Sequence, residues 1–109
     1  MGAFVKGDVV ITPFPFSDLR NAKRRPAVVV AELMGDDVIL CQVTSQARMD
    51  SYAIALSTDD FASGGLQIDS IARPNRLFTA DGKILVRKAG TLTQIKIQEI
   101  TNKIIEIVS

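Results

Sequence analysis

Histidine and tryptophan are absent from this sequence of 109 residues, and there is a single cysteine, Cys41. Without histidine, the chain has no Ser-His-Asp or Cys-His nucleophile, no histidine-ligated zinc and no histidine pair for acid–base catalysis. If the chain is an enzyme, its proton transfers depend on carboxylates, Arg, Lys, Tyr52 or water. One cysteine cannot form an internal disulfide, which excludes a disulfide framework. Cys41 lies in the middle of an expected strand and is interpreted as a buried core residue.

Long apolar runs are also missing: none approaches the roughly 18 residues that a membrane-spanning helix needs. The N-terminus has no charged segment, apolar segment or cleavage site of a signal peptide, so we expect a cytoplasmic protein without a membrane partner. The 13 basic and 12 acidic residues leave a net charge of +1, too small for an acidic tail or a histone-like protein. A hydrophobic content of 47% excludes a disordered chain. The length predicts a single domain over residues 1–109.

Many short apolar runs separated by turn signals predict a mostly β fold. The expected strands are Val9–Ile11, Pro26–Ala31, Val38–Val43, Tyr52–Leu56, Leu66–Ile71, Leu77–Thr79 and Ile84–Arg87. The Val38–Val43 run is nearly continuous and predicts burial on both faces. The segment Gln94–Val108 instead predicts an amphipathic helix, with a stripe at Ile97, Ile100, Ile104 and Val108 and an N-cap at Thr91 with Gln94 or at Thr93 alone. The expected fold is a small barrel of about six strands with one C-terminal helix.

Positive charge is concentrated in one place, where Arg20, Lys23, Arg24 and Arg25 lie in a loop that runs into a strand. Such a cluster on a nearly neutral protein is typical of a phosphate-binding surface. A solvated, mobile loop is the alternative. Two details favour phosphate binding: Pro26 fixes Arg25 at the start of a strand, and a guanidinium grips phosphate through two hydrogen bonds.

Polar side chains at two further places are candidates for chemistry. Thr44-Ser45-Gln46 follows the buried strand and offers hydroxyl and amide groups to a phosphate or sugar, or else marks a simple strand-to-turn transition. Asp69 lies within a strand-like pattern, where a carboxylate is disfavoured, so it is functional, solvent-facing or paired with Arg73 or Arg76.

Aromatic residues in the first loop, Phe14-Pro15-Phe16-Ser17-Asp18, suit either stacking on bases or plugging one end of the barrel. Asp8, which follows Gly7, is interpreted as a turn or backbone-binding group. The sequence contains no glycine-rich phosphate loop and no cluster with metal-ligand spacing, so it predicts neither a metal nor a cofactor.

These motifs occur in a recognisable order. They are Gly7-Asp8-Val9-Val10, Lys23-Arg24-Arg25-Pro26-Ala27-Val28-Val29-Val30, Val43-Thr44-Ser45, Ile68-Asp69-Ser70 with Arg73-Pro74, and Ala89-Gly90-Thr91-Leu92-Thr93 before a terminal helix. Over nearly its whole length the chain resembles the MazF/PemK (Kid) family of type II toxin–antitoxin endoribonucleases. The Phe-Pro-Phe-Ser-Asp loop and Arg73-Pro74-Asn75-Arg76-Leu77-Phe78-Thr79 resemble its PemK-like branch.

The resemblance implies an SH3-like barrel of the CcdB/MazF type that forms a homodimer and cleaves single-stranded RNA without metal. The 2′-hydroxyl attacks the adjacent phosphate, which leaves a 2′,3′-cyclic phosphate and a 5′-hydroxyl. A cognate antitoxin with an acidic, extended tail blocks the site. Two other classes stay open: a non-catalytic SH3-like binding module or inactive homologue, and a CcdB-like gyrase poison.

The resemblance also implies roles for individual residues. The catalytic set is Arg25, Thr44 and Asp69, and the RNA-binding set is Ser45, Arg20, Lys23, Arg24, Phe16, Asp18, Gln67 and Arg73. Gln67 occupies a place where Kid-like members carry an arginine, so the acid role falls to Arg25 or Arg73. The general base stays open between Asp69 and Asp18, and the histidine that some relatives carry in the first loop is missing.

Overall fold

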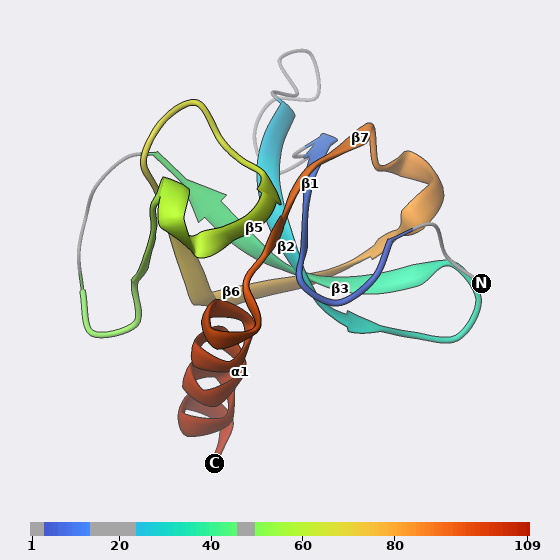
Figure 1. The fold of residues 1–109 in the computed structure, drawn as a ribbon. Helices are drawn as coiled ribbons and strands as arrows, with labels where there is room; N and C mark the ends of the chain where they lie inside the picture. Colours follow the sequence, from blue (N-terminus) through green and yellow to red (C-terminus); the bar gives the residue numbers. More distant parts are fainter. Residues whose placement is uncertain (1–3, 14–23, 46–49) are drawn as a thin grey trace.

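The computed structural model describes residues 4–13, 24–45 and 50–109. The described part of the chain forms seven strands and one α-helix (Figure 1). These are β1 (Asp8–Pro13), β2 (Arg24–Glu32), β3 (Asp37–Thr44), β4 (Ile54–Leu56), β5 (Phe61–Gly64), β6 (Ser70–Asp81), β7 (Arg87–Leu92) and α1 (Gln94–Val108), with short 3-10 helices η2 (Thr58–Asp60) and η3 (Gly82–Ile84). No helix in these ranges is long and apolar enough to span a membrane.

The seven described strands belong to one sheet with the order β4-β6-β3-β2-β1-β7-β5. Each strand is antiparallel to its neighbours in this order. The two edge strands, β4 and β5, are separated in the chain only by residues 57–60. Because so short a connection joins opposite edges, the sheet must curl until its edges approach each other, and Figure 1 shows this curl. The prediction of a small, mostly β barrel with a C-terminal helix is confirmed, with the barrel only half closed.

Three predicted strands differ from the structure. Residues 65–69 form no strand, so the predicted strand over Leu66–Ile71 is wrong, and the predicted Leu77–Thr79 strand is part of the longer β6. Residues 82–84 form η3, and the final strand begins at Arg87, where the predicted one ends. The short β5 was not predicted at all.

A bulge explains how β6 runs through Pro74. Cys41 pairs with Leu77 while the next residue of β3, Gln42, pairs with Arg73, so residues 74–76 have no partner on that strand. Pro74 therefore loses no ladder hydrogen bond although proline cannot donate one.

Alternating residues bury two core layers, one on each face of the curled sheet. The larger layer comprises Val9, Val28, Cys41, Val43, Ile54, Leu56, Ala72, Leu92 and Ile100. The smaller layer comprises Val10, Ala27, Val29, Val38, Leu40, Ala80 and Leu85. Strand β3 contributes to both layers, which confirms the predicted burial on both faces. Cys41 is a core residue, and burial raises the pKa of its thiol to about 12.

Helix α1 packs against one end of the sheet through part of its predicted stripe (Figure 1). Ile100 is 1% exposed, and Ile97 and Ile104 are partly buried against the larger core layer. Val108, the last member of the stripe, is 73% exposed because the helix extends beyond the strands. Off the stripe, Ile95 is 83% exposed.

The start of α1 is fixed to the segment that joins the edge strands. Thr93 caps the helix alone, accepting a hydrogen bond from the Lys96 backbone at 3.3 Å, as the second of the two predicted arrangements has it. The Lys96 Nζ lies 3.5 Å from Asp60 Oδ1, and the Ser57 backbone donates to Asp60 at 2.8 Å. Burial alone would raise the pKa of Asp60, but the Ser57 hydrogen bonds and Lys96 outweigh it and hold that pKa below its ordinary value.

Gly7 and Asp8 fasten the start of β1 to its surroundings. Gly7 has φ of +98°, and a Cβ there would collide with the Ile97 side chain of α1. Asp8 is 2% exposed. Its carboxylate accepts hydrogen bonds from the Val5 backbone at 3.0 Å and from the Thr91 hydroxyl at 3.1 Å. The interpretation of Asp8 as a backbone-binding group is confirmed, and its partner on β7 adds a contact across the sheet.

Candidate functional site

A groove of about 540 Å³ opens at the end of the sheet away from α1. The end of β1 and the starts of β2 and β7 meet there because β1 runs antiparallel to both (Figure 1). The end of β3 and the segment between β5 and β6 complete the walls. The lining residues are Ile11, Arg24, Arg25, Pro26, Val43, Thr44, Ser45, Gly65, Leu66, Gln67, Ile68, Arg87 and Ala89.

The strand register explains why Arg25 and Thr44 lie at the same place. Ala27 of β2 pairs with Gln42 of β3, and this register carried two residues further brings Arg25 alongside Thr44. On the other side Arg25 pairs with Thr12 of β1, which is fully buried. The backbone of Arg25 is therefore held in a rigid part of the sheet, near Thr44, which is half-buried.

Three guanidinium groups give the groove its charge. Arg24, Arg25 and Arg87 line it, and among the residues that the structure describes none of those lining the groove carries a carboxylate. Within the ranges that the structure describes, none of the three arginines forms an ion pair. Their charge is therefore available to an anion, and hydrogen bonds to charged groups contribute about 1.5–3 kcal/mol each. Arginines in this setting suit phosphate oxygens.

Apolar side chains share the groove with the arginines. Ile11, Pro26, Leu66 and Ala89 are partly buried, whereas Ile68 is 65% exposed. The described lining of the groove thus combines positive charge, which suits a phosphate, with an aliphatic surface, which suits the less polar parts of a ligand.

The structure brings five of the predicted site residues together at the groove: Arg24, Arg25, Thr44, Ser45 and Gln67. Four others, Phe16, Asp18, Arg20 and Lys23, lie outside the described residues.

The remaining two predicted site residues do not line the groove. Asp69 directly follows the wall residue Ile68 but is exposed, and it forms no hydrogen bond or ion pair with the side chains of residues 4–13, 24–45 and 50–109. Arg73 forms an ion pair with Asp50 at 2.7 Å. Of the alternatives left open for Asp69, the structure shows the solvent-facing one rather than an ion pair with Arg73 or Arg76.

Asp50 is well bound in this position. Burial alone would raise its pKa, but hydrogen bonds from the Tyr52 and Ala53 backbone and from Arg73 outweigh it and lower that pKa from its ordinary value. The contact holds the Arg73 guanidinium against Asp50, on the β4 side of β6.

Arg87 is the principal lining residue that the sequence did not indicate. It pairs with Ile11 of β1, which in turn pairs with Pro26 of β2, so these residues form a row across three strands. The pairing joins segments far apart in the chain and leaves no local pattern. The signal that the sequence offers is weak: Arg87 is a cation at the end of the predicted strand Ile84–Arg87.

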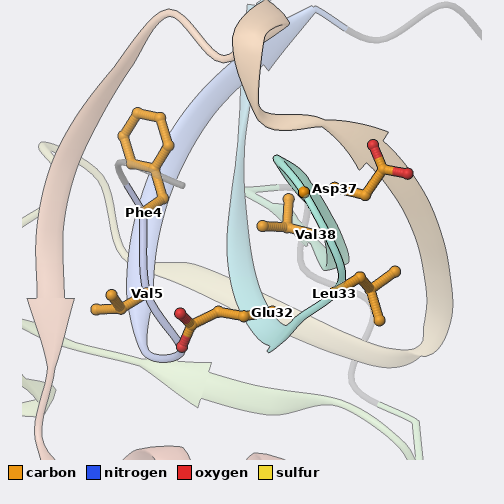
Figure 2. A pocket seen from close by; sticks show the side chains of 7 residues that line it. Phe4, Val5, Glu32, Leu33, Asp37 and Val38 are labelled. Carbon is orange, nitrogen blue, oxygen red and sulfur yellow. The ribbon is translucent and has the colours of Figure 1, made fainter. Parts of the chain in front are cut away.

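A second hollow, of about 320 Å³, has the opposite character. Figure 2 shows Phe4 and Val5 of the N-terminal segment beside the turn between β2 and β3. The lining residues are Phe4, Val5, Glu32, Leu33, Gly35, Asp37 and Val38. Its charged groups are carboxylates, and Glu32 accepts a hydrogen bond from the Lys6 backbone at 3.3 Å. Carboxylates disfavour a phosphate, so the arginine-lined groove suits an anion better than this hollow does.

No group of three or more His, Cys, Asp or Glu residues in the described ranges is placed to hold a metal ion. The chemistry that the groove can offer through its own side chains is electrostatic stabilisation of an anion by arginine and hydrogen bonding by Thr44, Ser45 and Gln67.

Solved structures with a similar fold include proteins from mycobacteria and from Deinococcus radiodurans. An endoribonuclease from a mycobacterial species superimposes with a TM-score of 0.74 at 17% identity, covering 99% of this chain and 93% of the other. MazF from Deinococcus radiodurans gives 0.74 at 18% identity, covering 96% of both chains. A mycobacterial endoribonuclease in complex with its cognate antitoxin gives 0.73 at 14% identity, covering 99% and 95%. At these identities the similarity establishes the fold.

A comparison with curated proteins gives no match. The family model for the PemK-like, MazF-like toxin of type II toxin–antitoxin systems matches residues 5–108. This range runs from the segment before β1 to the end of α1 and includes every described element of the groove. The chain therefore belongs to the PemK-like, MazF-like family of type II toxin–antitoxin toxins.

Proposed function

We propose that this toxin is a sequence-selective, metal-independent endoribonuclease that cleaves single-stranded mRNA in the cytoplasm and so inhibits translation and growth. The observation that carries the proposal is the groove, where the described lining combines Arg25 and Thr44 with Arg24 and Arg87 and includes no carboxylate. Membership of the toxin family and the similarity of the fold to that of a mycobacterial endoribonuclease support the same proposal.

The proposed reaction is an internal transesterification. A base removes the proton of the 2′-hydroxyl, and that oxygen forms a bond to the adjacent phosphorus. The bond from phosphorus to the 5′-oxygen breaks, and the leaving oxygen takes up a proton. The products are a 2′,3′-cyclic phosphate and a 5′-hydroxyl. Negative charge builds on the phosphoryl oxygens in the transition state, so prepositioned cations there lower the barrier.

Arg25 is proposed as the group that stabilises this charge and donates the proton to the leaving oxygen. Its backbone is held in place by pairing with the buried Thr12 of β1. Thr44 and Ser45 are proposed to hydrogen-bond the same phosphate from the end of β3. Arg24 and Gln67 are proposed to bind flanking parts of the RNA.

The base is proposed to be Asp69 or Asp18. Asp69 follows the groove wall at Ile68, and its exposed side chain has no described partner to hold it elsewhere. Asp18 belongs to the first loop with Phe16, Arg20 and Lys23, for which RNA binding stays a prediction.

The first test is to incubate pure protein with a long single-stranded RNA in EDTA and sequence the 5′ ends of the products. Discrete cuts with 5′-hydroxyl ends are expected. Arg25→Ala should abolish them, whereas the matched control Arg76→Ala, an exposed arginine of β6 outside the groove, should leave them intact. Thr44→Ala should raise the barrier by about 1–3 kcal/mol.

Retained cleavage by Arg25→Ala would overturn the assigned mechanism. Wild-type rates in both Asp69→Asn and Asp18→Asn would place the base elsewhere. If the wild-type protein leaves RNA intact while circular dichroism shows it folded, the proposed activity is wrong. The binding-module reading then replaces it, and gyrase becomes the next target to test.

A cognate antitoxin is the proposed protein partner. A neighbouring structure is an endoribonuclease with its antitoxin, and another is a MazE-MazF complex from Deinococcus radiodurans. An acidic, extended antitoxin tail would complement the arginines of the groove. We further propose a homodimer in which two such grooves serve one RNA strand. Sedimentation of the toxin alone and with an acidic peptide tests both points.

A further inference from the structure

We propose that Arg87 binds a second backbone phosphate of the RNA, next to the one that Arg25 holds for cleavage. This inference rests on the proposed function and assigns a substrate contact to a residue that the sequence did not indicate. Arg87 is exposed, lines the groove and forms no ion pair with any residue that the structure describes.

The register fixes the face on which Arg87 lies. Arg87 pairs with Ile11, and Ile11 pairs with Pro26. Paired residues in an antiparallel sheet point to the same face, so all three share the groove. Arg24, two residues before Pro26, shares this face as well. Arg24 of β2 and Arg87 of β7 thus flank an apolar strip formed by Ile11 and Pro26, and Arg25 lines the same groove from the end of the sheet.

Lys88 provides the contrast. It is the next residue on β7 and is also exposed, but it pairs with Val10, which belongs to the smaller core layer on the other face. Lys88 does not line the groove. Two adjacent cations on one strand therefore differ in the face that they occupy.

The spacing points to separate phosphates. Strand β1 lies between β2 and β7, and neighbouring strands are about 4.8 Å apart, so the backbones at Arg25 and Arg87 are separated by roughly 10 Å. A strand of RNA that crosses the sheet end from β2 to β7 would place one phosphate at each side. The apolar strip between them would face the ribose or base that joins the two phosphates.

The test measures binding of a fluorescent 2′-O-methyl RNA, which lacks the attacking hydroxyl and is not cleaved, with the sequence of a mapped cleavage site. Fluorescence anisotropy gives Kd at several salt concentrations. Arg87→Ala should weaken binding about tenfold and should reduce the slope of log K against log salt by about 0.7, the value for one phosphate contact on a single strand. Lys88→Ala removes the same charge from the neighbouring residue and should leave the slope unchanged. Arg87→Lys should keep most of the wild-type slope.

Cleavage kinetics provide a second readout. Arg87→Ala should raise KM and leave kcat near the wild-type value, because the residue binds away from the reacting phosphate, whereas Arg25→Ala should lower kcat. Circular dichroism checks that each variant is folded. The inference is overturned if Arg87→Ala keeps the wild-type slope and Kd, or if Lys88→Ala loses as much as Arg87→Ala. Failure of the wild-type protein to bind RNA would instead overturn the proposed function itself.

Discussion

Replacing Thr91 with valine should destabilise the protein without changing its groove. The Thr91 hydroxyl donates a hydrogen bond to the Asp8 carboxylate at 3.1 Å, and Asp8 is 2% exposed. Valine keeps the shape of threonine but cannot donate. A hydrogen bond to a charged group contributes about 1.5–3 kcal/mol, and water has little access to replace it, so we expect a loss of about 2 kcal/mol.

Asp8→Ala should be more severe. It removes the acceptor for the Val5 backbone at 3.0 Å as well as for Thr91. The two contacts together give an expected loss of about 3–5 kcal/mol, a large part of the roughly 5–15 kcal/mol by which a domain is stable. Asp8→Asn, which keeps an acceptor oxygen for Val5 and an amide that can donate to the Thr91 hydroxyl, should lose about 1 kcal/mol.

Urea unfolding followed by circular dichroism measures these differences, provided that the m-value stays constant. A double-mutant cycle with Asp8→Ala and Thr91→Val isolates the contact between the two side chains. If Asp8→Ala does not fold, Thr91→Val and Asp8→Asn still decide the matter. A loss below about 0.5 kcal/mol in Thr91→Val would refute the reasoning. RNA cleavage per folded molecule should stay unchanged in Thr91→Val, because neither residue lines the groove.

Three further predictions concern the core and the helix. Ile100→Ala should cost about 2–5 kcal/mol in urea unfolding because Ile100 is 1% exposed, whereas Ile95→Ala on the same helix should stay within about 0.5 kcal/mol. Asp60 has a lowered pKa in the folded protein, so its contribution to stability is complete above the ordinary pKa of 3.8. That contribution is lost as the pH falls through the lower pKa of the folded state. Asp60→Asn should therefore flatten the acid limb of a curve of unfolding free energy against pH. The Cys41 thiol, with its pKa raised to about 12, should react with a thiol reagent only on unfolding, and rapid labelling of the native protein would contradict this.

The fold was predictable where local patterns and tertiary packing agree. The isoleucine stripe predicts α1, and the β-branched runs predict β2 and β3. In each case the spacing of the apolar residues matches the face that the element buries. The alternation of Leu66, Ile68 and Ser70 imitated a strand with the same period. In the structure Gly64 and Gly65, which both have positive φ, turn the chain, and Ile68 is exposed as part of a groove wall. Residues 65–69 form no strand, and pairing begins only at Ser70, where β6 starts.

The candidate site was predictable in part for the same reason. Arg25 and Thr44 stand at the ends of strongly patterned strands, so their positions follow once those strands are known to pair. Arg87 was missed because its place depends on the pairing of β7 with β1, strands separated by most of the chain. The ion pair of Arg73 with Asp50 was not predictable either, because Asp50 lies 23 residues earlier and nothing local indicates the contact; RNA binding by Arg73 stays a prediction.

The lengths of the sheet's outer strands bear on how this chain avoids aggregation. The inner strands run for 6 to 12 residues, but β4 at one edge has 3 residues and β5 at the other has 4. Exposed edges are templates for the addition of another chain's strand, and edges this short offer few free backbone groups. In a sequence that is 47% hydrophobic, the short β4 and β5 thereby limit sheet extension at these two strands.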